Sequence, residues 1–257
     1  MRNVFTIVGK ELRSYFVSPV AYVVLTGFLL LGGWFFFNLL SRFNLLLSLY
    51  MQMQGGEAAN RMNLNEYVVA PLMHNLAIVL VILVPMITMR AYAEEKKGGT
   101  YELLLTSPVR TGEIVVGKFL ASFLFICIMI GLTGVYPAIL MKFGNPETGV
   151  IFSGYLGLIL LATVFVAVGL FTSSLTENQI IAAVSGLVAT LLLYIIGWPA
   201  ETAGDTLGPL LRYLSVTEHF AEMVRGIINT RSLVYFVSLI ALALFLTQRS
   251  IESLRWR

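Results

Sequence analysis

Six long stretches of this chain contain no Asp, Glu, Lys or Arg and consist mostly of apolar residues. An α-helix rises about 1.5 Å per residue and the hydrocarbon core of a bilayer is about 30 Å thick, so roughly 20 apolar residues make one crossing. Because lipid cannot hydrogen-bond to free backbone N–H and C=O groups, each stretch is predicted to cross as a helix. We therefore expect an all-α membrane protein with six transmembrane helices, at Ser14 to Ser41, Tyr67 to Met89, Phe119 to Met141, Thr148 to Thr176, Asn178 to Ala200 and Ser232 to Gln248.

The composition agrees with this prediction and limits what else the chain can contain. Hydrophobic residues make up 58% of the 257 residues and charged residues 12%, against about 25% charged residues in an average soluble domain. After six crossings and their flanks are subtracted, no segment is long enough for a separate soluble catalytic domain. The first stretch is too long for the core of a signal peptide, so it is expected to remain as a crossing. Cys127 is the only cysteine, which excludes a disulfide within the chain.

The distribution of basic residues predicts the orientation. Eleven of the 17 lysines and arginines fall on one side of the six-crossing plan and six on the other. By the positive-inside rule the richer side is cytoplasmic, which places both termini in the cytoplasm and the chain in the inner (cytoplasmic) membrane. The formal net charge of +3 then reflects topology, and we do not expect nucleic acid as a partner.

The opening residues, 1–18, are predicted to form a helix lying in the cytoplasmic interface. Apolar residues recur at helical spacing up to Pro19, which ends the pattern. Lys10, Glu11 and Arg13 would be unfavourable inside lipid. These charges favour an interfacial helix over the alternative, an extension of the first crossing.

An external loop is expected from Arg42 to Glu66. It contains Met51 and Met53, whose thioether pair could bind Cu(I), because soft sulfur ligands select soft metals. No Cys or His accompanies the pair in the loop. Gap filling at an interface is therefore the favoured interpretation, and no metal is expected.

A second external segment, 201–231, is predicted to contain an amphipathic helix. Ser215 and Glu218 form a capping-box pattern at its start. One face of the helix is expected to be apolar (Phe220, Met223, Val224, Ile227 and Ile228) and the opposite face polar (His219, Glu222, Arg225 and Asn229). The pattern leaves open whether the segment lies flat or re-enters the membrane after Pro209.

The longest cytoplasmic connection, residues 90–118, is more elaborate than a connecting loop requires. It has a charged helical end (94–97), a Gly98-Gly99 break, a short apolar helix from Thr100 to Leu105 and a stop at Pro108. A stiff, partly apolar helix flanked by charges is typical of an element that docks on a partner. The alternative is a solvated run of charges.

The run Ala93 to Pro108, followed by Gly117-Lys118, resembles the coupling region of ABC-2 type transporter permeases. The resemblance implies that residues 90–114 dock on a separate ATP-hydrolysing subunit, that two permeases pair with two ATPases, and that ATP and Mg are bound by the ATPase rather than by this chain. Gly98 stands where Ser is more usual, which loosens the expected joint. The residues assigned to coupling are Glu94, Glu95, Gly99, Thr100, Glu102, Leu105, Pro108 and Lys118.

The end of the chain resembles the branch of this family associated with gliding motility and with nitrous-oxide-reductase maturation. The resemblance is carried by Arg225-Gly226, Phe236, the run 238–240 and the run Glu252 to Trp256. It makes a periplasmic accessory protein a further candidate partner.

Two other motifs give weaker indications of function than the coupling region does. Gly112 to Phe119 matches a phosphate-binding loop except at Phe119, which has no hydroxyl to reach Mg, so ATP hydrolysis by this chain alone is not expected. His74 and His219 form no metal-binding motif. His74 lies near the outer end of the second crossing, where a neutral hydrogen-bonded histidine is favoured over a proton relay.

Two other functional classes remain open. A secondary transporter or channel would work without ATP, but the crossings contain no Asp, Glu, Lys or Arg to bind a coupling ion. A membrane scaffold is the third class, and glycine-rich helix faces would allow homodimer or heterodimer packing. We predict a permease subunit of an ATP-driven exporter that contacts membrane lipid. Its apolar interior fits a lipid-like or hydrophobic cargo, or a mechanical role.

Overall fold

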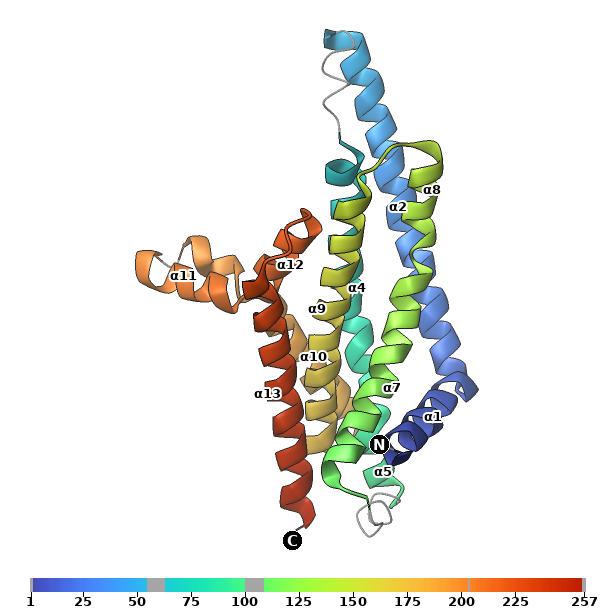
Figure 1. The fold of residues 1–257 in the computed structure, drawn as a ribbon, viewed down its shortest axis with the longest axis vertical. Helices are drawn as coiled ribbons and strands as arrows, with labels where there is room; N and C mark the ends of the chain where they lie inside the picture. The colour runs from blue at the N-terminus through green and yellow to red at the C-terminus, as the bar shows by residue number, and fades with distance from the viewer. Residues whose placement is uncertain (1, 55–62, 100–108, 203, 256–257) are drawn as a thin grey trace.

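The computed structural model describes residues 2–54, 63–99, 109–202 and 204–255, and nearly all of them are helical (Figure 1). No strand occurs among these residues, which confirms the predicted all-α class. The helices are α1 (Arg2–Val17), α2 (Pro19–Gln54), the π-helix η1 (Asn65–Val69), α4 (Ala70–Thr88), α5 (Arg90–Lys97), α7 (Thr111–Leu132), α8 (Val135–Phe143), α9 (Thr148–Leu175), α10 (Gln179–Ile195), the 3-10 helix η2 (Trp198–Glu201), α11 (Gly204–Leu214), α12 (Val216–Val224) and α13 (Thr230–Arg255).

Six segments of the described chain are long and apolar enough to cross a membrane, and they correspond one to one with the predicted crossings. The second joins η1, α4 and α5, and the third joins α7 and α8. The spans are Pro19–Gln52, Asn65–Lys97, Thr111–Phe143, Thr148–Leu175, Gln179–Ala200 and Thr230–Ser253.

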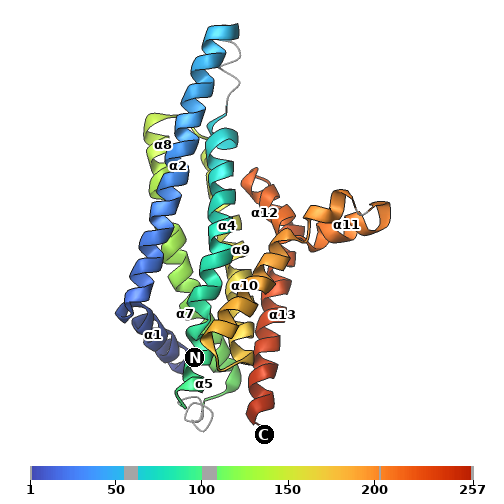
Figure 2. The same cartoon turned by 180° about the vertical axis from the view of Figure 1, so that it is seen from behind.

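The long helices form an elongated bundle with α1, α5 and the C-terminal end of α13 at one end (Figure 1). We call this the terminal end. Both views place α11 outside the bundle, projecting sideways from the region of α12 (Figures 1 and 2). We call α11, α12 and the first turns of α13 the far-side arm.

Helix α9 is the centre of the bundle and packs against α4, α5, α7, α10, α12 and α13. Its contact with α4 depends on Gly169. A Cβ atom at this position would overlap Thr88 Oγ1, so any larger side chain would force the two helices apart. Small residues that let backbones approach closely are a common feature of helix pairs in membranes.

Pro85 lies inside α4 and leaves one backbone carbonyl without its usual helical partner. This is the carbonyl of Val81, four residues earlier, and the hydroxyl of Thr190 on α10 donates to it at 3.3 Å. Gly186 makes room for this contact, because a Cβ there would lie 3.3 Å from Pro85 Cβ. The second and fifth spans are thereby joined at a point where a backbone group would otherwise be unpaired in lipid.

The structure corrects the predicted loop from Arg42 to Glu66. Helix α2 continues to Gln54, so the first half of that segment is helical. Met51 lies on this helix with 56% of its surface exposed. The side chain of Met53 lies outside the described residues. Among the described residues, no group of three His, Cys, Asp or Glu side chains could hold a metal ion.

In segment 201–231 one prediction is confirmed and two are wrong. Ser215 caps α12 by accepting the N–H of Glu218, as the capping pattern predicts. His219, predicted on the polar face, is buried with Phe220 and Met223. The predicted stripe also ends early, because α12 stops at Val224 and both Ile227 and Ile228 are exposed.

Candidate functional site

Lys118, predicted to link the coupling segment to the third span, is the centre of a buried ion cluster at the terminal end. Its side chain is 2% exposed. The Nζ atom lies 2.8 Å from Glu11 Oε1 of α1 and 2.9 Å from Glu95 Oε1 of α5. It also donates to the backbone carbonyl of Ala91 at 2.7 Å. These contacts use all three donors of the ammonium group, so Lys118 joins α1, α5 and α7.

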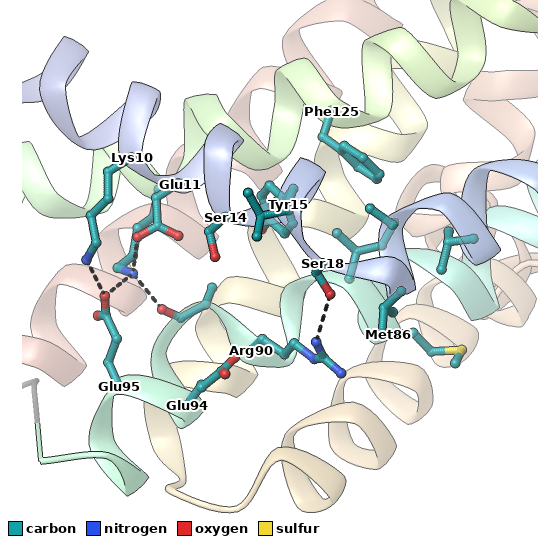
Figure 3. A pocket seen from close by; sticks show the side chains of 17 residues that line it. Lys10, Glu11, Ser14, Tyr15, Ser18, Met86, Arg90, Glu94, Glu95 and Phe125 are labelled. Atoms are coloured by element: carbon teal, nitrogen blue, oxygen red, sulfur yellow. Dashed lines mark hydrogen bonds and ion pairs between the residues drawn. The ribbon is translucent and has the colours of Figure 1, made fainter.

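The cluster is balanced in charge. Lys10 Nζ lies 3.3 Å from the same Glu95 oxygen, and its side chain is 66% exposed. Two ammonium groups therefore face two carboxylates, as Figure 3 shows for Lys10, Glu11 and Glu95. Removing one partner from a buried ion pair typically costs about 3–5 kcal/mol, because the charge left behind is uncompensated. Lys118 is the buried member, so it is the residue whose loss matters most.

A close contact between α1 and α7 brings Glu11 within reach of Lys118. Gly117 precedes Lys118, and a Cβ there would lie 2.7 Å from Ile7 Cγ2 on α1. Farther along the pair, the rings of Tyr15 and Phe125 stack with centroids 5.2 Å apart. Tyr15 Oη and Ser122 Oγ are 2.9 Å apart and hydrogen-bonded. Burial raises the pKa of the Tyr15 hydroxyl to about 12, against the lowering effect of Ser122, and Glu11 adds to the rise.

A second connection ties α5 to the central helix α9. Ser173 Oγ accepts the N–H groups of Tyr92 and Ala93 at 3.1 and 3.2 Å and donates to the carbonyl of Met89 at 2.8 Å. The Met89 carbonyl and the Ala93 N–H are four residues apart and would bond to each other in a continuous helix, so Ser173 is inserted into the ladder. Lys96 adds a bond from Nζ to the carbonyl of Ser174 at 2.5 Å.

The predicted coupling residues divide into three groups. Glu95 and Lys118 point inward, into the ion cluster. Glu94 and Gly99 are exposed, and Gly99 has a φ of +68°, a conformation that favours glycine and ends α5. Thr100, Glu102, Leu105 and Pro108 lie outside the described residues. The Gly98-Gly99 joint is hydrogen-bonded, with Gly98 N–H donating to Glu94 O and Gly99 N–H to Lys96 O.

The structure also locates the other candidate motifs. Residues 112–119 lie in the first turns of α7, so Gly112 and Gly117 are helical and form no phosphate-binding loop. His74 is partly buried in α4, and its ring meets Phe220 of α12 edge-on at 5.3 Å.

Sequence reasoning missed a polar cluster in the far-side arm. His219 Nδ1 lies 3.0 Å from Ser232 Oγ, which donates to Glu222 Oε2 at 2.8 Å. His219 Nε2 lies 3.1 Å from the carbonyl of Tyr213 in α11. The imidazole ring stacks on Tyr235 with centroids 4.2 Å apart. These contacts hold α11 and α12 against the start of α13.

Comparison with known proteins identifies the family of the chain. The family described as ABC-2 family transporter protein matches residues 6–249, nearly the whole chain. None of the curated proteins matches the chain. Together with the six apolar spans, the family match identifies a multi-pass membrane protein.

Proposed function

The chain belongs to the ABC-2 transporter family, and we propose that it serves as the permease subunit of an ATP-driven exporter. In this proposal a separate ATPase subunit binds ATP and Mg and docks between α5 and α7, within the predicted coupling segment of residues 90–114. Two permease chains, identical or different, pair with two ATPase subunits. Both termini lie in the cytoplasm of a cell whose inner membrane holds the six spans.

The proposal rests on one observation: the helices before and after the docking segment are bonded to each other. Helix α5 precedes the segment and α7 follows it, and Lys118 of α7 bonds to both Glu95 and the Ala91 carbonyl of α5. Displacement of the segment by an ATPase would therefore move α5 and α7 together. The bonds between α5 and Ser173 would carry the same movement to α9, the centre of the bundle.

Glu95 has a different role in this proposal from the one that the sequence suggests. Its side chain is 15% exposed and faces Lys118, so it stabilises the joint and does not contact the ATPase. In this proposal Glu102 remains the predicted contact with the ATPase. Export, a lipid-like or hydrophobic cargo, a periplasmic accessory protein and the gliding or nitrous-oxide-reductase branch are further parts of the proposal that rest on resemblance.

The test is reconstitution of the purified chain with its ATPase subunit in lipid nanodiscs. We expect hydrolysis only when the ATPase is present, and we expect Glu102→Lys to abolish co-elution of the two subunits while the permease remains inserted. The matched control is Arg249→Glu, an exposed charge reversal at the terminal end of α13. Unchanged co-elution of Glu102→Lys, or equal loss in the control, would contradict docking at this segment.

A further inference from the structure

A cavity of about 420 Å³ lies at the terminal end, between α1, the start of α2 and the junction of α4 with α5 (Figure 3). The two ends of the cavity differ. Lys10, Glu11 and Glu95 line one end, and the apolar residues Met86 and Phe125 line the other. Val17 and Val20 also line it, and they are 73% and 37% exposed. The cavity is thus amphipathic and opens beside apolar surface at the edge of the bundle.

Two charged groups lining this cavity are not used by the ion cluster. Among the described residues, Arg90 makes one long hydrogen bond, from Nη1 to Ser18 Oγ at 3.5 Å, and its buried Nε has no hydrogen-bond partner. No carboxylate of the described residues forms an ion pair with its guanidinium. The side chain of Glu94 likewise has no ion pair within that part of the chain. A guanidinium usually satisfies several of its five donors, so Arg90 is suited to an external acceptor.

We propose that this cavity binds one zwitterionic glycerophospholipid whose headgroup carries a primary amine. The phosphate would accept hydrogen bonds from Arg90, since a planar guanidinium matches phosphate oxygens. The ammonium group would donate to Glu94. The acyl chains would lie against Val20, Val24 and Met86, continuous with the surrounding bilayer.

The presence of one cation and one anion on the same helix favours this headgroup. Arg90 and Glu94 are four residues apart on α5, so they lie on one face of the helix with Cβ atoms about 5–6 Å apart. An ethanolamine headgroup holds its phosphate and ammonium at a similar short separation through a two-carbon linker. A glycerol headgroup has no cation for Glu94, and a quaternary amine has no N–H to donate to it.

The position of the bound lipid gives it a structural consequence. The lipid would fill the space beside the ion cluster, between α1 and the junction of α4 and α5. This junction lies at Met89 and Arg90. Lipid binding and the Lys118 cluster would then stabilise the same arrangement of α1 and α5. This inference does not depend on an ATPase partner, so it can fail or succeed independently of the proposed function.

Native mass spectrometry of the delipidated protein tests the proposal, with phosphatidylethanolamine, phosphatidylglycerol and inorganic phosphate as separate probes. We expect one tightly bound phosphatidylethanolamine and clear preference over phosphatidylglycerol. Arg90→Ala should weaken binding of both lipids roughly ten- to a hundredfold, the effect of losing a charge-assisted hydrogen-bonded contact. Glu94→Gln should remove the preference and leave phosphatidylglycerol binding unchanged.

Two further variants test whether the lipids bind in this cavity. Val20→Trp should weaken both lipids by obstructing the apolar end at an exposed position that leaves both charges in place. Arg249→Ala, which removes another terminal-end arginine outside the cavity, should leave both affinities unchanged. Wild-type affinity in Arg90→Ala, or an equal loss in Arg249→Ala, would overturn the proposal. Competition by inorganic phosphate alone would also overturn it in favour of a simple anion site.

Discussion

The terminal end and the far-side arm are held together by different physical means. At the terminal end, three helices meet at one buried ammonium that contacts two carboxylates and a backbone carbonyl. In the far-side arm, α11, α12 and α13 meet at a stacked imidazole with two neutral polar neighbours, Ser232 Oγ and the Tyr213 carbonyl. The contacts at the terminal end are ionic. Those in the far-side arm are mainly aromatic, and α11 of this arm projects outside the bundle (Figure 2).

The two kinds of contact differ in stiffness. A buried ion pair fixes one geometry, because separating the partners leaves an uncompensated charge. Aromatic stacking and single hydrogen bonds are worth about 0.5–1.5 kcal/mol each and tolerate rearrangement better. The stiffer joint lies at the end where the proposed ATPase would act. The looser one carries α11, whose exposed Leu207 and Leu210 are not covered within the described chain.

The largest expected effect is that of Lys118→Met, which removes the ammonium and keeps the length of the side chain. Glu11 and Glu95 would then be left close together without their buried cation, and we expect a loss of about 3–5 kcal/mol in unfolding free energy. Thermal unfolding in detergent micelles, with protease access to α1, measures the effect. Lys10→Met is the matched control, and because Lys10 is exposed we expect a loss of about 0–1 kcal/mol. Equal losses would show that burial of the cluster has no energetic consequence.

Gly117→Ala tests whether close helix packing is what brings the cluster together. The added methyl would overlap Ile7 of α1, and overpacking of this kind costs about 1–3 kcal/mol. The comparison variant is Gly131→Ala on the same helix, where a Cβ would meet no atom of the described residues within 4 Å. There the better helix propensity of Ala should leave stability unchanged or slightly higher. If Gly117→Ala behaves like Gly131→Ala, the contact between α1 and α7 is not tight.

His219→Phe probes the far-side arm in the same way. The ring can still stack on Tyr235, but the contacts to Ser232 and the Tyr213 carbonyl are lost, and we expect about 1–2 kcal/mol of destabilisation. Hydrogen exchange should rise in α11 and α12 and stay unchanged at α5. A rise that reached the terminal end would contradict the separation of the two regions.

Tyr15→Phe has the smallest expected effect, about 1 kcal/mol, because one hydrogen bond to Ser122 is lost. It also gives a pH signature. The folded pKa of Tyr15 is raised to about 12, above the unfolded value of about 10, so the folded state keeps a proton that the unfolded state releases. Its contribution to stability is therefore complete below about pH 10 and is lost as the pH rises toward 12. Unfolding between pH 9 and 11 should show a flatter decline in Tyr15→Phe than in the wild type, and parallel declines would contradict the assignment.

The sequence predicts the spans well because hydropathy and length alone determine them. The six crossings and the Ser215 cap are local features, and both are confirmed. The charge-free stretch ends before Arg42, whereas α2 continues to Gln54. A helix can continue beyond the bilayer, where water and polar side chains are compatible with it.

The candidate sites depend on contacts that local patterns do not contain. The motif identifies Lys118, but its partner Glu11 lies 107 residues away and is brought close only by packing of α1 on α7. The helical pattern puts His219 on a polar face, but α13 packs over that face and buries the histidine. The sequence does not single out Ser173 as a contact between helices, because a serine at the end of an apolar span is common.

The central claim is that α5 and α7 move as one unit when the ATPase acts. Pulsed electron spin resonance can measure this with labels at Lys97→Cys and Leu124→Cys in a Cys127→Ser background, with the ATPase partner and a non-hydrolysable ATP analogue. We predict an unchanged distance within this pair on nucleotide binding, and a changed distance between Leu124→Cys and a label at Phe245→Cys on α13. A nucleotide-dependent change between Lys97→Cys and Leu124→Cys in the protein with Lys118 intact would contradict the account.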